Sequence, residues 1–94
     1  MNRIVIAAAA TALVFAAGAA NAQEDLAKKN GCLNCHAIDS KKVGPSYKDI
    51  AAKYKGKDGA AQKIVGELKA GKGHPAVKAS DDDIKSLVNW VLAM

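Results

Sequence analysis

The most regular pattern of hydrophobic positions lies near the end of the chain, where apolar residues recur at intervals of three and four. The residues of this stripe are Ile84, Leu87, Val88, Val91 and Leu92. Such spacing places side chains on one face of an α-helix. Ser80 precedes the stripe as an N-cap residue, and the three aspartates that follow it suit the positive end of a helix. The pattern therefore predicts a final helix that begins directly after Ser80.

Shorter helices are predicted earlier in the chain. Their expected spans are Leu26 to Asn30, Ser46 to Gly56, and Asp58 to about Ala70. The second of them opens on a Ser-x-x-Asp cap formed by Ser46 and Asp49, and Gly71 is a typical stop for the third. Residues 71–79 are expected to form a loop because glycine and proline dominate them. Together these elements predict an all-α protein.

The first 22 residues have the pattern of a secretory signal peptide. Arg3 supplies a positive charge, the run from Ile4 to Ala17 is apolar, and Ala20-Asn21-Ala22 is an A-x-A cleavage site. We therefore expect residues 1–22 to be cleaved and residues 23–94 to form one small domain in the periplasm. An uncleaved anchor helix is the alternative, but the apolar run is short for a membrane span.

The motif Cys32-Leu33-Asn34-Cys35-His36 is the C-x-x-C-H signature of c-type haem attachment. Two thiols on one turn can add across the two vinyl groups of a haem, which leaves the neighbouring His36 below the iron as an axial ligand. We therefore predict one haem c, covalently bound through Cys32 and Cys35. The porphyrin would also supply part of the core that so short a chain struggles to build.

Two other chemistries use a pair of cysteines at this spacing. A zinc site would use Cys32, Cys35, His36 and His74. Because Cys35 and His36 are adjacent, however, they suit tetrahedral geometry poorly. A thioredoxin-type dithiol pair is expected among strands, and the sequence around the motif shows no strand pattern.

Four stretches of the chain match one known group of proteins. They are Lys29-Asn30-Gly31-Cys32-x-x-Cys35-His36-Ala37-Ile38, Lys42-Val43-Gly44-Pro45-x-Tyr47-Lys48-Asp49-Ile50-Ala51, Ser80-Asp81-Asp82 and Trp90-Val91-Leu92. In this order they resemble the small bacterial class I cytochromes c, the cytochrome c551/c552 group, over nearly all of residues 23–94. The resemblance implies an all-α fold of about four helices wrapped around one haem, in a monomer.

The resemblance also implies contacts for single residues. The carbonyl of Pro45 would accept a hydrogen bond from the ring N–H of His36, which orients that ligand. The first and last helices would cross near Gly31 and Trp90. We interpret the aromatic residues Tyr47, Tyr54 and Trp90 as core or haem-propionate contacts, and Tyr47 is predicted to bind the cofactor.

The chain departs from this group at the sixth iron ligand. The group has a methionine in a Met-Pro pair before the final helix, whereas His74 precedes Pro75 here, and the two methionines of the chain are Met1 and Met94. The favoured interpretation is that His74 ligates the iron, so that the haem is bis-histidine. The alternatives are an open or water-bound sixth site, and ligation by Lys72, Lys78 or Met94.

These features predict a soluble periplasmic carrier of single electrons. Imidazole is a stronger donor than a thioether, so we expect a lower reduction potential than in the methionine-ligated relatives. The alternative is a ligand-binding or sensor cytochrome in which His74 dissociates to admit a small gas molecule. An enzyme such as a peroxidase is disfavoured, because no acid or base group accompanies His74 and a chain of this length has little room for a substrate cavity.

The charge of the chain favours protein partners over nucleic acid. Loss of Arg3 from 14 basic residues leaves 13 lysines against 9 acidic residues, a net charge of +4. The lysines are scattered and lack interleaved aromatic residues, unlike a nucleic-acid site. An oppositely charged redox partner is the expected kind of partner. The lysines near the motif, which either guide docking or only solvate the surface, are Lys28, Lys29, Lys41, Lys42 and Lys48.

Overall fold

The computed structural model of the protein describes residues 21–94. In chain order its regular elements are a helix over residues 21–29, the 3-10 turn η1 (Cys32–Asn34), and the helices α2 (Tyr47–Tyr54), α3 (Ala60–Ala70) and α4 (Asp81–Leu92). No residue in this part of the chain belongs to a β-strand, so the all-α prediction is confirmed. Most of the predicted leader, residues 1–20, lies outside the described residues. Between residues 21 and 94, no helix is long and apolar enough to cross a membrane.

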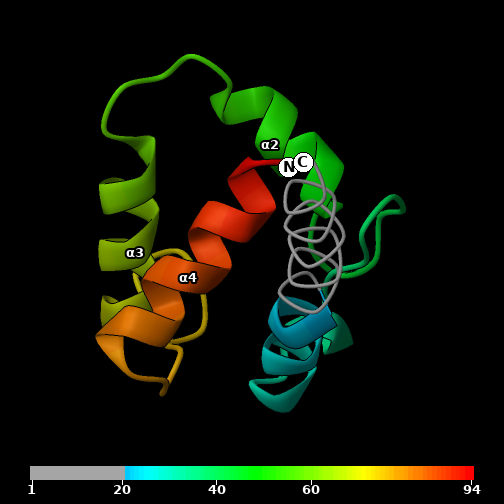
Figure 1. Ribbon diagram of the computed structural model, residues 1–94, viewed down its shortest axis with the longest axis vertical. Coiled ribbons are helices and arrows are strands. Elements are labelled where there is room, and N and C mark those ends of the chain that lie inside the picture. The colour runs from blue at the N-terminus through cyan, green and yellow to red at the C-terminus, as the bar shows by residue number, and fades with distance from the viewer. Residues whose placement is uncertain (1–20) are drawn as a thin grey trace, which may run out of the picture.

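The packing is centred on α4. This helix contacts both α2 and α3, and Figure 1 shows it between α3 and the part of the chain that holds helix 21–29. Its residues Ile84, Leu87 and Val88 are buried, as the stripe predicted. In addition, Gln23 Nε2 donates a hydrogen bond to Ser86 Oγ, which ties helix 21–29 to α4.

Capping serines explain where α2 and α4 begin. Ser46 Oγ accepts a hydrogen bond from the Asp49 N–H at 3.1 Å, and Ser80 Oγ accepts one from the Asp83 N–H at 3.2 Å. Each bond satisfies a backbone N–H that the first turn of a helix leaves without a partner. Both predicted helix starts are confirmed.

Two other helix starts differ from expectation. The helix α3 begins at Ala60 rather than Asp58, because Gly59 has a left-handed φ of 76° that interrupts helical geometry. The first helix already includes residues 21–25. Residues 21–25 include no glycine, proline or β-branched residue, so their helix propensities allow the helix to include them.

Gly31 ends the first helix and is not a point where another helix packs closely. Its φ of 77° is left-handed, and a side chain added there would meet only Asn34 within 4 Å. The hydrogen-bonded contact between the first and last helices lies instead at Gln23 and Ser86. The expected close approach of the last helix at Gly31 is therefore wrong, whereas the part of Trp90 in the crossing stays a prediction.

The helix α2 joins two halves of the molecule (Figure 1). One half contains helix 21–29 and η1, and the other contains α3, α4 and the loop between them. Backbone hydrogen bonds from the Gly44 N–H to the Cys35 carbonyl and from the Tyr47 N–H to the Ala37 carbonyl fold residues 35–47 back on themselves. The two halves face each other across a crevice, which brings together the residues singled out by the sequence.

Candidate functional site

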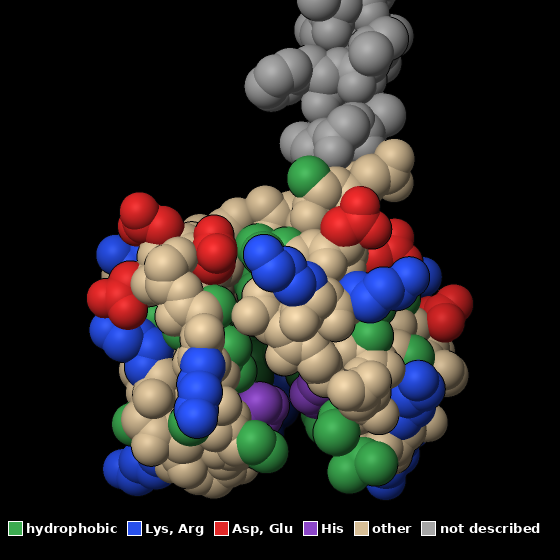
Figure 2. Space-filling view, turned by 90° about the horizontal axis from the view of Figure 1, so that it is seen from below, with side chains coloured by type: hydrophobic (Ala, Val, Ile, Leu, Met, Phe, Trp, Pro, Cys, Tyr) green, Lys and Arg blue, Asp and Glu red, His purple; other side chains and the backbone are tan. Residues whose placement is uncertain are grey.

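The crevice has an apolar inner chamber and a wider outer cleft. The cavity volume is about 100 Å³ in the chamber and about 410 Å³ in the cleft. The hydrophobic stripe of α4 forms much of the chamber wall, and Cys32, His36, His74 and Val77 line both spaces. Figure 2 shows the two histidines of the chain on opposite sides of this hollow. Apolar walls with a few polar groups are typical of cofactor sites.

Cys32 and Cys35 lie at the edge of the outer cleft. Cys32 begins η1, and the His36 N–H donates to the Cys32 carbonyl at 3.0 Å, which closes the turn. Both thiols are free and half-buried, and burial raises the pKa of the Cys32 thiol. The turn therefore presents two free thiols beside the apolar space, as thioether attachment requires.

The zinc and dithiol alternatives find no support in this geometry. Across residues 21–94, no three His, Cys, Asp or Glu side chains gather closely enough to hold one metal ion together. The cysteine pair stands on a helical turn, and the described chain around it contains no strand.

The ring of His36 is held by contacts with residues 44–47. Its Nδ1 lies 2.6 Å from the Pro45 carbonyl oxygen. Because a carbonyl only accepts, Nδ1 is the donor, and in the neutral ring Nε2 keeps its lone pair. Gly44 lies against the same ring, where an added Cβ would come within 2.5 Å of Cε1. The structure thus brings together His36 and Pro45, which the resemblance paired.

The ring of His74 makes an equivalent hydrogen bond, which the sequence did not predict. Its Nδ1 lies 2.7 Å from the carbonyl oxygen of Pro75, the next residue in the chain. Nδ1 of His74 is therefore also the donor, and its Nε2 is free to bind a metal. The loop that carries His74 is tied to the end of α3, because the Val77 N–H donates to the Leu68 carbonyl at 2.8 Å.

The separation of the two imidazole rings matches that of ligands to one metal ion. Their planes are 4° from parallel and their centroids are 6.1 Å apart. Two metal–imidazole bonds of about 2 Å, with about 1.1 Å from each nitrogen to its ring centre, require a separation of roughly 6 Å. The histidines, the apolar walls and the two thiols therefore fit a haem that lies between the rings.

Tyr47 packs against one of these two histidines. It is 5% exposed. Its ring stacks on His36 with centroids 5.3 Å apart, and it meets Trp90 edge-on at 5.7 Å. Burial, followed by the neighbouring Cys32, raises the pKa of its hydroxyl far above the usual range. In contrast, Tyr54 is half-buried and lies beneath the ammonium groups of Lys53 and Lys57, 5.4 and 5.8 Å from its ring centre.

The alternative sixth iron ligands, Lys72, Lys78 and Met94, lie in other places than His74. Of the four candidates, all within residues 21–94, only His74 lines the inner chamber. Lys78 lines only the outer cleft, and Lys72 lines neither space. Met94 follows α4, is 38% exposed and lines neither space. The geometry favours His74.

The sequence as a whole decides the family. Residues 19–94 match the sequence model of the Cytochrome c family. The chain belongs to the cytochrome c family. It is similar to cytochrome c-552 of Nitrosomonas europaea, with 47% identity over 94 residues that cover 92% of this chain and 90% of that protein. Cytochrome c-551 of Pseudomonas aeruginosa is 42% identical over 92 residues, covering 89% of this chain and 88% of that protein.

Two solved structures share the fold of this cytochrome. The class 1 cytochrome MtoD from Sideroxydans lithotrophicus ES-1 gives a TM-score of 0.72 at 38% identity, covering 78% of this chain and 92% of that chain. Wild-type cytochrome c552 of Nitrosomonas europaea gives 0.66 at 47% identity, covering 74% and 96%. The predicted class I cytochrome c fold is confirmed. As a cytochrome c, the protein carries a single covalently bound haem c and is an electron carrier rather than an enzyme.

Proposed function

We propose that this cytochrome c is a bis-histidine electron carrier of the periplasm. In this proposal Cys32 and Cys35 bind the haem through thioether bonds, and His36 and His74 are its two axial ligands. The observation that carries the proposal is the pair of imidazole rings, whose planes are 4° from parallel and whose centroids are 6.1 Å apart. Each ring has its Nδ1 committed to a backbone carbonyl, which leaves each Nε2 for the metal.

The residues of the chain set the conditions for electron transfer. The haem itself supplies the redox chemistry, because its iron takes up and releases one electron. The carbonyls of Pro45 and Pro75 accept hydrogen bonds from the two ligand rings, which raises the basicity of both rings. Strong donors favour ferric iron, so we infer a lower reduction potential than in methionine-ligated relatives.

The proposed location follows from the leader pattern. Residues 1–22 have a charged start, an apolar run and an A-x-A site, as in exported proteins. Export also fits the chemistry, because bacteria normally attach haem c outside the cytoplasm. The working protein would then be residues 23–94, which the resemblance suggests is a monomer.

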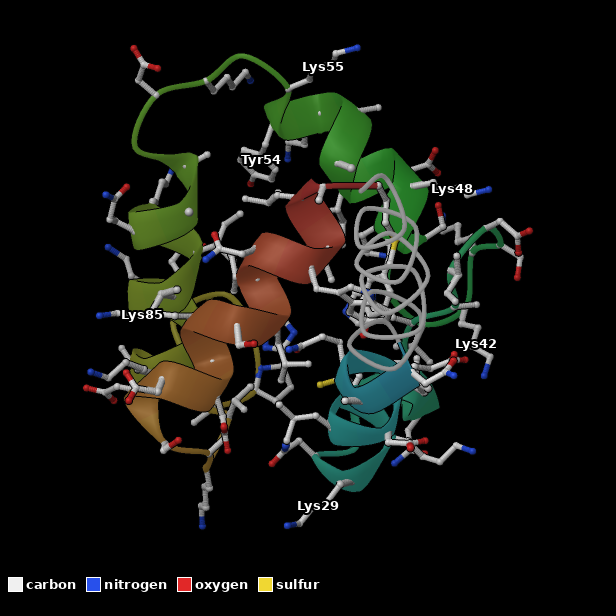
Figure 3. All side chains as sticks on the ribbon, in the orientation of Figure 1. Lys29, Lys42, Lys48, Tyr54, Lys55 and Lys85 are labelled. Carbon is white, nitrogen blue, oxygen red and sulfur yellow. The ribbon has the colours of Figure 1, made fainter. Side chains whose placement is uncertain are left out.

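Redox partners would dock where the outer cleft opens. Lys29 and Lys78 line this opening. Figure 3 shows that Lys29, Lys42 and Lys48 extend away from the body of the protein, although Lys42 Nζ also donates to a nearby backbone carbonyl, that of Leu33, at 3.1 Å. Such a surface would attract an acidic partner at low ionic strength.

One feature favours the ligand-binding alternative. Gly71 and Gly73, with φ of 71° and 70°, precede His74 and supply flexible positions in its loop. Against this, the backbone of the loop is tied at both ends, by the Lys72 N–H to Glu67 and the Val77 N–H to Leu68. We therefore propose the carrier, in which His74 stays bound in both oxidation states.

Absorption spectra of the holoprotein, oxidised and reduced, test this proposal beside a His74→Ala variant. We expect the wild type to be low-spin in both states, without a sulfur-to-iron band, and to leave carbon monoxide unbound. His74→Ala should become high-spin and bind carbon monoxide. Lys72→Ala and Lys78→Ala are matched controls that should match the wild type. A high-spin wild type, or one that binds carbon monoxide readily, would favour the sensor instead.

A further inference from the structure

The two candidate ligand rings are each held by the carbonyl of a proline, although the prolines belong to different segments. We infer that Pro75 is a positioning residue, which fixes the ring of His74 parallel to the ring of His36. The inference rests on the proposed function, in which both histidines bind the iron. Beyond that function, the inference specifies how the His74 ring is oriented and which residue fixes that orientation.

The local geometry around His74 leaves its ring little freedom. Its Nδ1 is 2.7 Å from the Pro75 carbonyl oxygen. The pyrrolidine ring of Pro75 locks φ near −65° and also restricts the backbone of His74 to extended conformations. Both the histidine and the carbonyl it contacts are therefore confined by the same residue, and rotation of the imidazole would break their hydrogen bond.

The ring of His36 is fixed independently, by residues of the other half of the molecule. Its Nδ1 is 2.6 Å from the Pro45 carbonyl oxygen. Gly44 lies against the ring, and Tyr47 stacks on it with an interplanar angle of 24°. Since neither ring can turn without losing a hydrogen bond, the 4° angle between them is a property that the chain imposes.

This orientation has a measurable electronic consequence. Two iron d orbitals, at right angles to each other, can interact with the π systems of the axial imidazoles. When the imidazole planes are parallel, both rings interact with the same d orbital, so the two d orbitals differ in energy. Ferric low-spin haem then gives three well-separated g values in electron paramagnetic resonance. Perpendicular planes leave the orbitals nearly equal in energy and give one dominant resonance at a much higher g value.

The test is the electron paramagnetic resonance spectrum of the frozen ferric holoprotein, with Pro75→Ala as the variant and Lys72→Ala as the control in the same loop. We expect the three-value spectrum from the wild type and the control. Pro75→Ala should broaden it or move it toward the single high-g form. Pro75→Ala keeps the backbone carbonyl but frees the backbone around it, so the hydrogen bond from His74 to this carbonyl should weaken. Cyanide binding, which requires His74 to leave, should then become faster by roughly two- to tenfold.

The outcomes separate this inference from the proposed function. A wild-type spectrum that is low-spin with one dominant high-g resonance would overturn the parallel orientation while leaving bis-histidine ligation in place. A high-spin wild type would overturn both. If Pro75→Ala matches the wild type in both its spectrum and its cyanide rate, Pro75 has no positioning role. The wild-type spectrum alone decides the orientation, even where the variant fails to hold its haem.

Discussion

Among single residues, Gly44 constrains the site most tightly. It lies against the ring of His36, where an added Cβ would stand 2.5 Å from Cε1 and 2.9 Å from Nδ1. The same Nδ1 must stay within hydrogen-bonding distance of the Pro45 carbonyl. A side chain at position 44 would therefore displace the ligand or the loop that orients it.

Gly44→Ala should destabilise the holoprotein by about 1–3 kcal/mol, the usual cost of overpacking a well-fitted contact. Gly66→Ala is the matched control, because a side chain added there meets nothing within 4 Å and alanine favours a helix interior by about 1 kcal/mol. Guanidinium unfolding, followed by the haem absorption, measures both. Equal stability of the two variants would show that position 44 is not crowded.

The sequence indicates the chemistry of the site better than its geometry. The reactive groups of the site were predictable from motif spacing and from the His-Pro pair. These groups are Cys32, Cys35, His36 and His74. The carbonyl of Pro75 was not, because this contact depends on backbone torsion angles that residue spacing does not specify. Likewise, the place of Tyr47 between His36 and Trp90 depends on how α2 and α4 pack.

Among the elements, α4 links the core to the loop that carries His74. Ser80 ends this loop and caps the helix. Lys69 Nζ lies 2.9 Å from Asp81 Oδ2, which joins the end of α3 to the start of α4 across the loop, and it lowers the pKa of that carboxyl. Both side chains of this pair are largely exposed, so the ion pair stabilises the protein little compared with the Ser80 cap.

Ser80→Ala should lower the free energy of unfolding by about 1 kcal/mol, because the Asp83 N–H loses its side-chain acceptor. The control is Lys85→Ala on the same helix, an exposed side chain that Figure 3 shows extending into solvent. Thermal unfolding of the two holoprotein variants provides the comparison. A Ser80→Ala variant as stable as Lys85→Ala would contradict the capping role.

The helices themselves were predictable where a local side-chain signal marks their ends. Ser46 and Ser80 cap the first turns that follow them, as their spacing to an aspartate suggested. The start of α3 was misplaced, because the left-handed conformation of Gly59 arises from the turn before the helix rather than from the helix pattern.

The whole molecule is built around the space that the haem would occupy. The buried hydrophobic residues of the described chain are few, and they are Ala27, Tyr47, Ala51, Ala60, Ile84, Leu87 and Val88. Much of the stripe on α4 lines the chamber as well. The haem would therefore complete a core that the polypeptide alone does not, as the length of the chain indicated.

The reduction potential of the holoprotein, measured beside a His74→Met variant, tests the central claim most directly. The introduced methionine would restore the thioether that related cytochromes place before the proline, and axial ligands move haem potentials over a span of about 0.8 V. If His74 is the sixth ligand, the wild type should lie below the variant by on the order of 0.1 V or more. Equal potentials, or a wild type above the variant, would contradict bis-histidine ligation.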